Sequence, residues 1–169
     1  MTRAHFSGAR GRVSLLAAVV FAAVCAGEAG AATWKGLEPL KSRRTEVERA
    51  LGRPVRDAVS EDGTLHFTVM GGRVTIFFVT PKFIAAKKLA PELEGTVLQI
   101  VLQHEAASDT PSSLKLDGDK RFERDSEGEV AVYRNLRDGV AYTFRGGKLI
   151  TTRYSPPAEQ LARLAQKKK

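Results

Sequence analysis

Two histidines, His66 and His104, are the side chains beyond the first thirty residues that could most readily move protons or bind a metal near neutral pH. Neither has a second histidine, a cysteine or a carboxylate at the spacing of a zinc site. A catalytic triad would also need a nucleophile held beside the histidine, and no motif marks one. We therefore expect two ordinary, partly exposed histidines, with no metal, no cofactor and no enzymatic activity.

Carboxylates gather in two places between residues 117 and 129. Asp117-Gly-Asp119 resembles the start of a calcium loop, but Arg121 and Phe122 stand where that loop needs an oxygen ligand and a glycine. The run Asp125–Glu129, DSEGE, is compatible with weak binding of a hard cation or with a solvated acidic turn, and the solvated turn is the commoner case. No strong metal site is predicted here.

The glycine pairs Gly71-Gly72 and Gly146-Gly147 lack the pattern of a phosphate-binding loop. The sequence also contains no GxSxG, HExxH or dinucleotide fingerprint. The common catalytic motifs are therefore excluded.

Basic residues are in excess, with 27 Lys and Arg against 19 Asp and Glu. The densest runs are Lys41-Ser42-Arg43-Arg44 and the terminal Lys167-Lys168-Lys169. They favour either an anionic partner, such as lipid or a cell-wall polymer, or a merely solvated surface. No motif for specific nucleic-acid binding accompanies them.

Trp34 is the one tryptophan. Tryptophan is enriched at interface hot spots, so Trp34 is a candidate partner-binding residue together with Lys41, Arg43 and Arg44. The alternative is that its large apolar ring closes the core near the start of the folded chain.

The first 31 residues have the pattern of a secretory signal peptide. Three arginines precede Val13–Gly27, an uncharged run of 15 residues that is shorter than the roughly 20 needed to span a bilayer. Ala29 and Ala31 supply small side chains, which predicts cleavage after Ala31 or Ala32 and export to the periplasm or beyond; the alternative is an uncleaved anchor. Cys25 lacks the residues of a lipoprotein signal before it, so lipidation is not expected.

After the signal, the chain predicts one α+β domain over 32–157, followed by a short helix and basic tail over 158–169. Ser42 is the expected N-cap of a helix over 43–51, which ends at Gly52 before Pro54. Further strands are expected over 96–103 and 130–134, whereas 81–94 is ambiguous and 117–129 offers only Phe122 to a core.

Two hairpins are the clearest local signals. Runs 65–70 and 73–80 flank Gly71-Gly72, and runs 140–145 and 148–154 flank Gly146-Gly147. In the first, a turn at both glycines would pair Phe67 with Ile76. Alternation then places six apolar side chains on one face: Leu65, Phe67, Val69, Val74, Ile76 and Phe78.

The hairpins also resemble each other at an offset of 75 residues, where Thr68 meets Thr143 and Pro81 meets Pro156. Self-similarity of this kind suggests a tandem repeat near 34–81 and 115–156. Shared turn chemistry is the alternative explanation.

The segment Trp34–Pro54, WKGLEPLKSRRTEVERALGRP, resembles the opening of a group of small, exported, uncharacterised bacterial proteins. Its part Val47–Pro54 is similar to a helix-ending motif of the small outer-membrane-assembly lipoproteins. The resemblance implies the helix-then-antiparallel-sheet fold that those lipoproteins share with β-lactamase inhibitor proteins, some of which are tandem copies.

Three hypotheses for function remain at this point. The first is a non-catalytic binding or assembly module that contacts another envelope protein through a sheet face or edge. The second is a basic protein that binds an anionic surface or polymer, and the third is an enzyme of unrecognised type. Salt separates the first two, because charge-driven binding weakens with ionic strength more than packing-driven binding does.

The signal pattern predicts that the exported protein begins at Ala32 or Thr33. Mass spectrometry of the exported protein measures this directly. An N-terminus at Met1, or a diacylated Cys25, would contradict the prediction.

Overall fold

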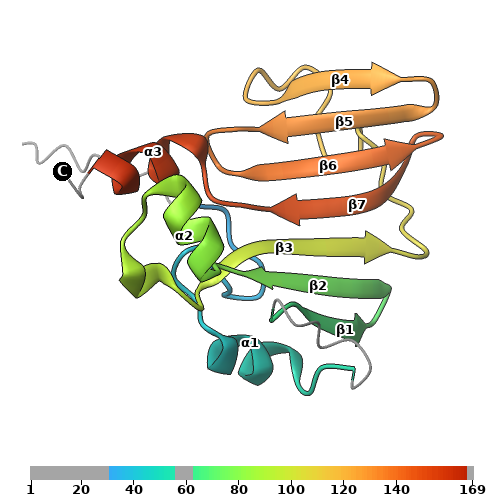
Figure 1. Cartoon of the computed structure of the whole chain (residues 1–169). Helices are drawn as coiled ribbons and strands as arrows, with labels where there is room; N and C mark the ends of the chain where they lie inside the picture. Colours follow the sequence, from blue (N-terminus) through green and yellow to red (C-terminus); the bar gives the residue numbers. More distant parts are fainter. Residues whose placement is uncertain (1–30, 56–62, 167–169) are drawn as a thin grey trace, which may run out of the picture.

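The structure is a computed structural model that describes residues 31–55 and 63–166. Residues 1–30 of the predicted signal peptide and the three terminal lysines lie outside the described residues. The described chain forms an α+β fold around one antiparallel sheet (Figure 1), which confirms the predicted fold class. In chain order the elements are α1 (Arg44–Leu51), β1 (Leu65–Val69), β2 (Gly72–Phe78), α2 (Pro81–Lys87), the 3₁₀ helix η2 (Pro91–Leu93), β3 (Val97–His104), β4 (Glu123–Glu127), β5 (Val130–Asn135), β6 (Val140–Arg145), β7 (Lys148–Tyr154) and α3 (Ala158–Gln166).

The sheet has seven strands in the order β1-β2-β3-β7-β6-β5-β4. Strands β1 to β3 and strands β4 to β7 each form an antiparallel series of neighbours. The two series meet where β3 pairs with β7, from Ile100 opposite Tyr154 to Gln103 opposite Thr151. This seam makes one continuous sheet from two groups of strands, as Figure 1 shows.

The first hairpin corrects the predicted register by two residues. Its turn is Met70-Gly71 and not Gly71-Gly72, so Phe67 lies opposite Val74, and Val69 opposite Gly72. Gly72 belongs to β2 with φ 155°, and a Cβ there would overlap the backbone oxygen of Gln103 on β3. Glycine is needed at position 72 for this close approach and not for the turn.

A shift of two residues leaves every side chain on its predicted face. Leu65, Phe67, Val74 and Ile76 are buried in one core cluster. Val69 and Phe78 pack against that cluster, so the predicted six-residue apolar stripe is confirmed.

The second hairpin has the predicted bounds and the predicted turn at Gly146-Gly147. The two turns are therefore 76 residues apart, not 75, and the matches found at 75 do not fall at equivalent positions of the two hairpins. Each hairpin is followed by a helix, α2 or α3. The tandem repeat stays a prediction.

One face of the sheet, the covered face, carries the core. The N-terminal segment and α1 pack over β1 to β3, where Leu37 and Val47 join the cluster that holds Phe67 and Ile100. The segment between β3 and β4 packs over β5 to β7, where Leu116 meets Phe144. Apolar side chains on alternate strand positions are thus removed from water on every strand of the sheet except β4.

Helices α2 and α3 form a further cluster, in which Leu161 and Leu164 of α3 pack against buried Ile84 and Leu89. Figure 1 shows the two helices together at the end of the sheet where β3 begins and β7 ends. The helix predicted after Pro157 is therefore packed onto the domain.

Helix α1 begins one residue later than predicted. Its N-cap is Arg43 and not Ser42, because the Ser42 hydroxyl accepts a hydrogen bond from the Glu38 backbone N–H. The Arg43 N–H instead donates to Glu46 at 2.8 Å. Gly52 ends the helix with φ 83°, as predicted.

The sequence pattern did not predict β4. This edge strand reads ERDSE and is exposed at every position, so no apolar alternation marks it. Charged residues on an edge strand discourage pairing with another chain. None of the described helices is long and apolar enough to cross a membrane.

The sidedness of the first hairpin predicts unequal effects of two adjacent substitutions. Phe67 is 1% exposed, so Phe67→Ala should cost roughly 3–5 kcal/mol or prevent folding. Thr68 is exposed, so Thr68→Ala should cost on the order of 0.5 kcal/mol. Urea unfolding of both variants tests this, and equal losses would contradict the assignment of faces.

Candidate functional site

The second face of the sheet, the open face, is the candidate functional site. It carries the residues that alternate with the core positions, and partners in register share it. None of these residues is buried, in contrast to the covered face. Strand by strand, the residues of the open face are His66 and Thr68 on β1; Arg73, Thr75 and Phe77 on β2; Gln99, Val101 and Gln103 on β3; Glu123, Asp125 and Glu127 on β4; Val130, Val132 and Arg134 on β5; Ala141, Thr143 and Arg145 on β6; and Lys148, Thr151 and Arg153 on β7.

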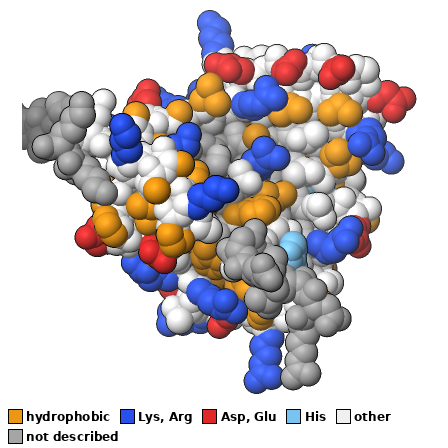
Figure 2. All heavy atoms as spheres, viewed as in Figure 1, with side chains coloured by type: hydrophobic (Ala, Val, Ile, Leu, Met, Phe, Trp, Pro, Cys, Tyr) orange, Lys and Arg blue, Asp and Glu red, His pale blue; other side chains and the backbone are white. Residues whose placement is uncertain are grey.

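Charge is divided across this face. Among its strand residues, carboxylates occur only on the edge strand β4, whereas cations occur on β2, β5, β6 and β7. Figure 2 shows acidic side chains along the edge over β4 and Lys and Arg side chains below it. The face therefore has an acidic border and a basic interior.

Three cations on adjacent strands form what we call the basic strip: Arg145, Lys148 and Arg153. Arg145 lies opposite Lys148, and Arg153 lies opposite Ala141 on β6 and Val101 on β3. All three side chains are exposed, and none makes an ion pair with another described residue. The strip is therefore available to an anionic group from outside.

The other two cations of the face have weak partners. Arg73 lies 3.4 Å from Glu105, with both side chains about two-thirds exposed at 66% and 63%. Arg134 lies 3.6 Å from Asp125. Exposed pairs of this kind contribute little stability, so a partner could replace them at small cost.

A pocket of about 390 Å³ lies at the β1–β3 end of the open face. Its polar lining includes His66, Thr75, Arg73 and Gln103, and Val55 lines it as well. The Val55 N–H donates to the His66 carbonyl at 2.9 Å, which holds this segment against the edge of β1. The pocket offers hydrogen-bonding groups and one guanidinium.

The two histidines lie on opposite faces and do not meet. His66 contacts the Thr75 hydroxyl at 3.1 Å on the open face, and His104 contacts the Thr152 hydroxyl at 2.9 Å on the covered face. Burial lowers the pKa of His104, and the charge of Asp109 opposes that effect. Neither histidine is hydrogen-bonded to a carboxylate among the described residues.

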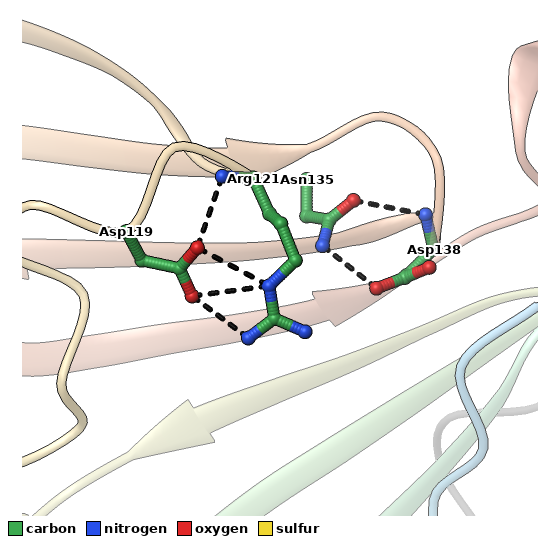
Figure 3. A network of polar contacts seen from close by, with 4 residues as sticks. All are labelled: Asp119, Arg121, Asn135 and Asp138. Atoms are coloured by element: carbon green, nitrogen blue, oxygen red, sulfur yellow. Dashed lines mark hydrogen bonds and ion pairs between the residues drawn. The ribbon is translucent and has the colours of Figure 1, made fainter.

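The Asp117–Asp119 turn is held by internal hydrogen bonds. Asp117 accepts from the Ser112 hydroxyl at 2.7 Å and from the Tyr133 hydroxyl at 2.8 Å. Asp119 accepts from its neighbour Arg121 at 2.7 Å through Nη2 (Figure 3). Within residues 31–55 and 63–166, no group of three or more His, Cys, Asp or Glu side chains could hold a metal ion.

A neighbouring pair in Figure 3 fixes the turn between β5 and β6. The buried Asn135 side chain donates to the Asp138 carboxylate at 2.7 Å and accepts from the Asp138 N–H at 3.0 Å. The Asp138 carbonyl in turn accepts from the Ala32 N–H at 2.8 Å. These polar groups hold the start of the described chain to the sheet.

The structure places Trp34 on the covered side. Its ring is half-buried against the core cluster of Phe67 and Ile100, and the Lys35 ammonium lies 5.4 Å from the ring centre. Backbone bonds with Leu37 close the tight turn that holds it. This position fits the alternative of a core-closing tryptophan.

The other three predicted binding residues have acceptors within the molecule. Lys41 pairs with Glu38 at 2.7 Å, and Arg44 pairs with Glu48 at 2.9 Å along the helix. Arg43 donates to the carbonyls of Glu92 and Glu94, which fastens α1 to η2. None of the three lies on the open face.

The cations of the open face were missed by the sequence reasoning. Arg73 and Lys148 each follow a glycine pair, and alternation along each strand could have placed them opposite the apolar stripes. Arg73 and Lys148 share one face of one sheet only because β3 pairs with β7, and no local sequence pattern reveals that pairing.

The comparisons with known proteins assign no family. No family model and no curated protein matches the chain. A solved structure of a DUF4309 family protein (YjgB) from Bacillus subtilis subsp. subtilis str. 168 is similar with 15% sequence identity and a TM-score of 0.48. The similarity covers 75% of this chain and 88% of that chain. The resemblance to the outer-membrane-assembly lipoproteins and β-lactamase inhibitor proteins stays a prediction.

The bonds at Asp117 predict a measurable pKa change. The Ser112 hydroxyl, followed by the Tyr133 hydroxyl, lowers the pKa of Asp117 by hydrogen-bonding its ionised form. Ser112→Ala should therefore raise that pKa toward its ordinary value, and Tyr133→Phe should raise it less. Carboxyl NMR titration of both variants, with Lys120→Ala as the control, tests this. An unchanged pKa in Ser112→Ala would contradict it.

Proposed function

We propose that the protein is a non-catalytic binding module of the cell envelope, which contacts a partner protein through the open face of its sheet. One observation carries the proposal. The described chain uses its N-terminal segment, α1 and the segment between β3 and β4 to bury one face, and no strand residue on the second face is buried.

The composition of the open face supports a role in binding. It combines threonine and glutamine side chains, which offer hydrogen bonds, with half-buried Val101, Val132 and Ala141. A polar surface with small apolar areas and arginine is typical of interfaces between proteins that also exist apart. The arrangement fits reversible contact with a partner.

The envelope as the site of action is supported by the N-terminal pattern alone. A basic start, a short uncharged run and small residues at the cleavage position are the features of an exported chain. The partner proposed is accordingly another envelope protein.

The alternative is an anionic surface bound through Lys41, Arg43, Arg44 and the terminal lysines, and the described geometry supports it less well. Arg43 holds two elements of the fold together and would lose those contacts on release. Lys41 and Arg44 form exposed ion pairs that contribute little stability, and the terminal lysines lie outside the described residues.

Site-specific photo-crosslinking in the organism that makes this protein tests the proposal. A photoreactive residue at Gln103 or Thr143, on the open face, should form a discrete adduct with a partner protein. The matched control positions are Ala50 and Lys87, which are exposed on α1 and α2. Adducts from the control positions alone, or from no open-face position, would overturn it.

A further inference from the structure

We propose that the partner presents an extended acidic segment, rich in Asp or Glu, which lies across the open face from the basic strip toward the pocket beside His66. This inference rests on the proposed function, and it adds the chemistry of the partner. It follows from how charge, spacing and the acidic border are arranged on the face.

The charges favour carboxylates as ligands. The basic strip has no ion-pair partner among the described residues, and Arg73 is held only by an exposed pair with Glu105. No strand residue on the open faces of β1, β2, β3, β5, β6 or β7 carries a carboxylate. An acidic ligand would complement this interior without losing a strong existing interaction.

The spacing favours a segment of chain over a single small anion. Arg73 on β2 is in line with Thr151 on β7, two strand spacings away, and Arg153 lies two residues further along β7, so the two arginines are about 12 Å apart. An extended peptide covers that distance in about four residues. Arg145 and Lys148 lie opposite each other and could share one phosphate ion, but Arg153 lies five residues along β7 from Lys148 and Arg73 lies on β2. A single small anion could therefore not contact the whole set, whereas a segment of chain could.

The residues between the cations suit a peptide. Thr143 and Thr151 lie opposite each other, and Gln103 lies opposite both Thr151 and Arg73. Their hydroxyl and amide groups can donate and accept hydrogen bonds, as the backbone of an extended segment requires. The row ends at the pocket of about 390 Å³, where Arg73 and His66 can receive one acidic side chain.

The acidic border argues against a flat anionic membrane. Glu123, Asp125 and Glu127 lie on the same face as the basic strip and are exposed. A membrane surface that met the strip would also meet these carboxylates and be repelled by them. A narrow segment can lie across the neighbouring strands β2, β3, β7 and β6 without reaching β4 at the edge of the sheet. Repulsion by the carboxylates of β4 would keep an acidic segment on those four strands.

Binding of labelled poly-L-glutamate to the folded, signal-cleaved protein, followed by fluorescence anisotropy, tests the inference. We expect binding at low salt that weakens strongly at about 0.5 M salt, because exposed charges are then screened. The double variant Arg145→Gln/Arg153→Gln should weaken binding about tenfold, since two exposed ion pairs are lost.

The matched control is Arg49→Gln/Lys87→Gln, which removes the same net charge from exposed positions on α1 and α2. Equal weakening by both double variants would overturn the inference, because net charge alone would then explain binding. Thermal unfolding of each variant verifies that the fold is retained.

Vesicles that contain phosphatidylglycerol separate the two sources of negative charge. We expect weaker binding to them than to poly-L-glutamate, and the reverse order would overturn the inference. If photo-crosslinking from the open face succeeds while poly-L-glutamate does not bind, the acidic partner is wrong and the proposed function stands. If open-face crosslinking fails, the proposed function itself is wrong.

Discussion

The pairing of β3 with β7 is the contact on which the rest of the molecule depends. Four residue pairs, from Ile100–Tyr154 to Gln103–Thr151, join two groups of strands that are otherwise far apart in the chain. On one side the seam brings the cluster of Phe67 and Ile100 beside the cluster of Phe144 and Leu149. On the other it brings cations from both groups of strands onto one surface. Local hairpins alone would be marginally stable, and their union supplies a sheet wide enough to bury a core.

The described chain covers only one face of that sheet. Burial on the covered face stabilises the fold, and the face left open is the candidate site. The apolar positions of each strand are covered by α1, by the N-terminal segment and by the chain between β3 and β4. Polar groups that could carry chemistry on the covered side are engaged in holding segments and turns in place, as at Asp117 and Asn135. The open face keeps Arg145, Lys148 and Arg153, which have no ion-pair partner among the described residues. The contacts that hold the fold and the proposed binding surface thereby lie on opposite faces.

Local signals predicted the local structure, and long-range pairing explains what they missed. The second hairpin has its predicted bounds because alternation and two turn glycines agree there. The predicted register of the first hairpin was wrong by two residues because Gly72 is required for the close approach to β3 and not for the turn. The sequence of the hairpin alone does not show that β3 lies beside it. Strand β4 was missed because an exposed, charged edge strand has no apolar period. The surface that joins the basic strip to Arg73 was missed for a different reason: the strip lies on the β6–β7 hairpin, and Arg73 of β2 comes onto the same surface only after the seam has formed.

Methyl NMR of the isotopically labelled protein titrated with poly-L-glutamate tests the central claim most directly, because methyl groups report separately on the two faces. Val101, Val132, Thr143 and Thr151 carry methyl groups on the open face, and Val74, Ile100 and Leu149 carry them in the core of the covered face. The account predicts shifts that grow with ligand at the first set and are absent at the second. Shifts confined to methyl groups outside the open face, or spread equally over both sets, would contradict it.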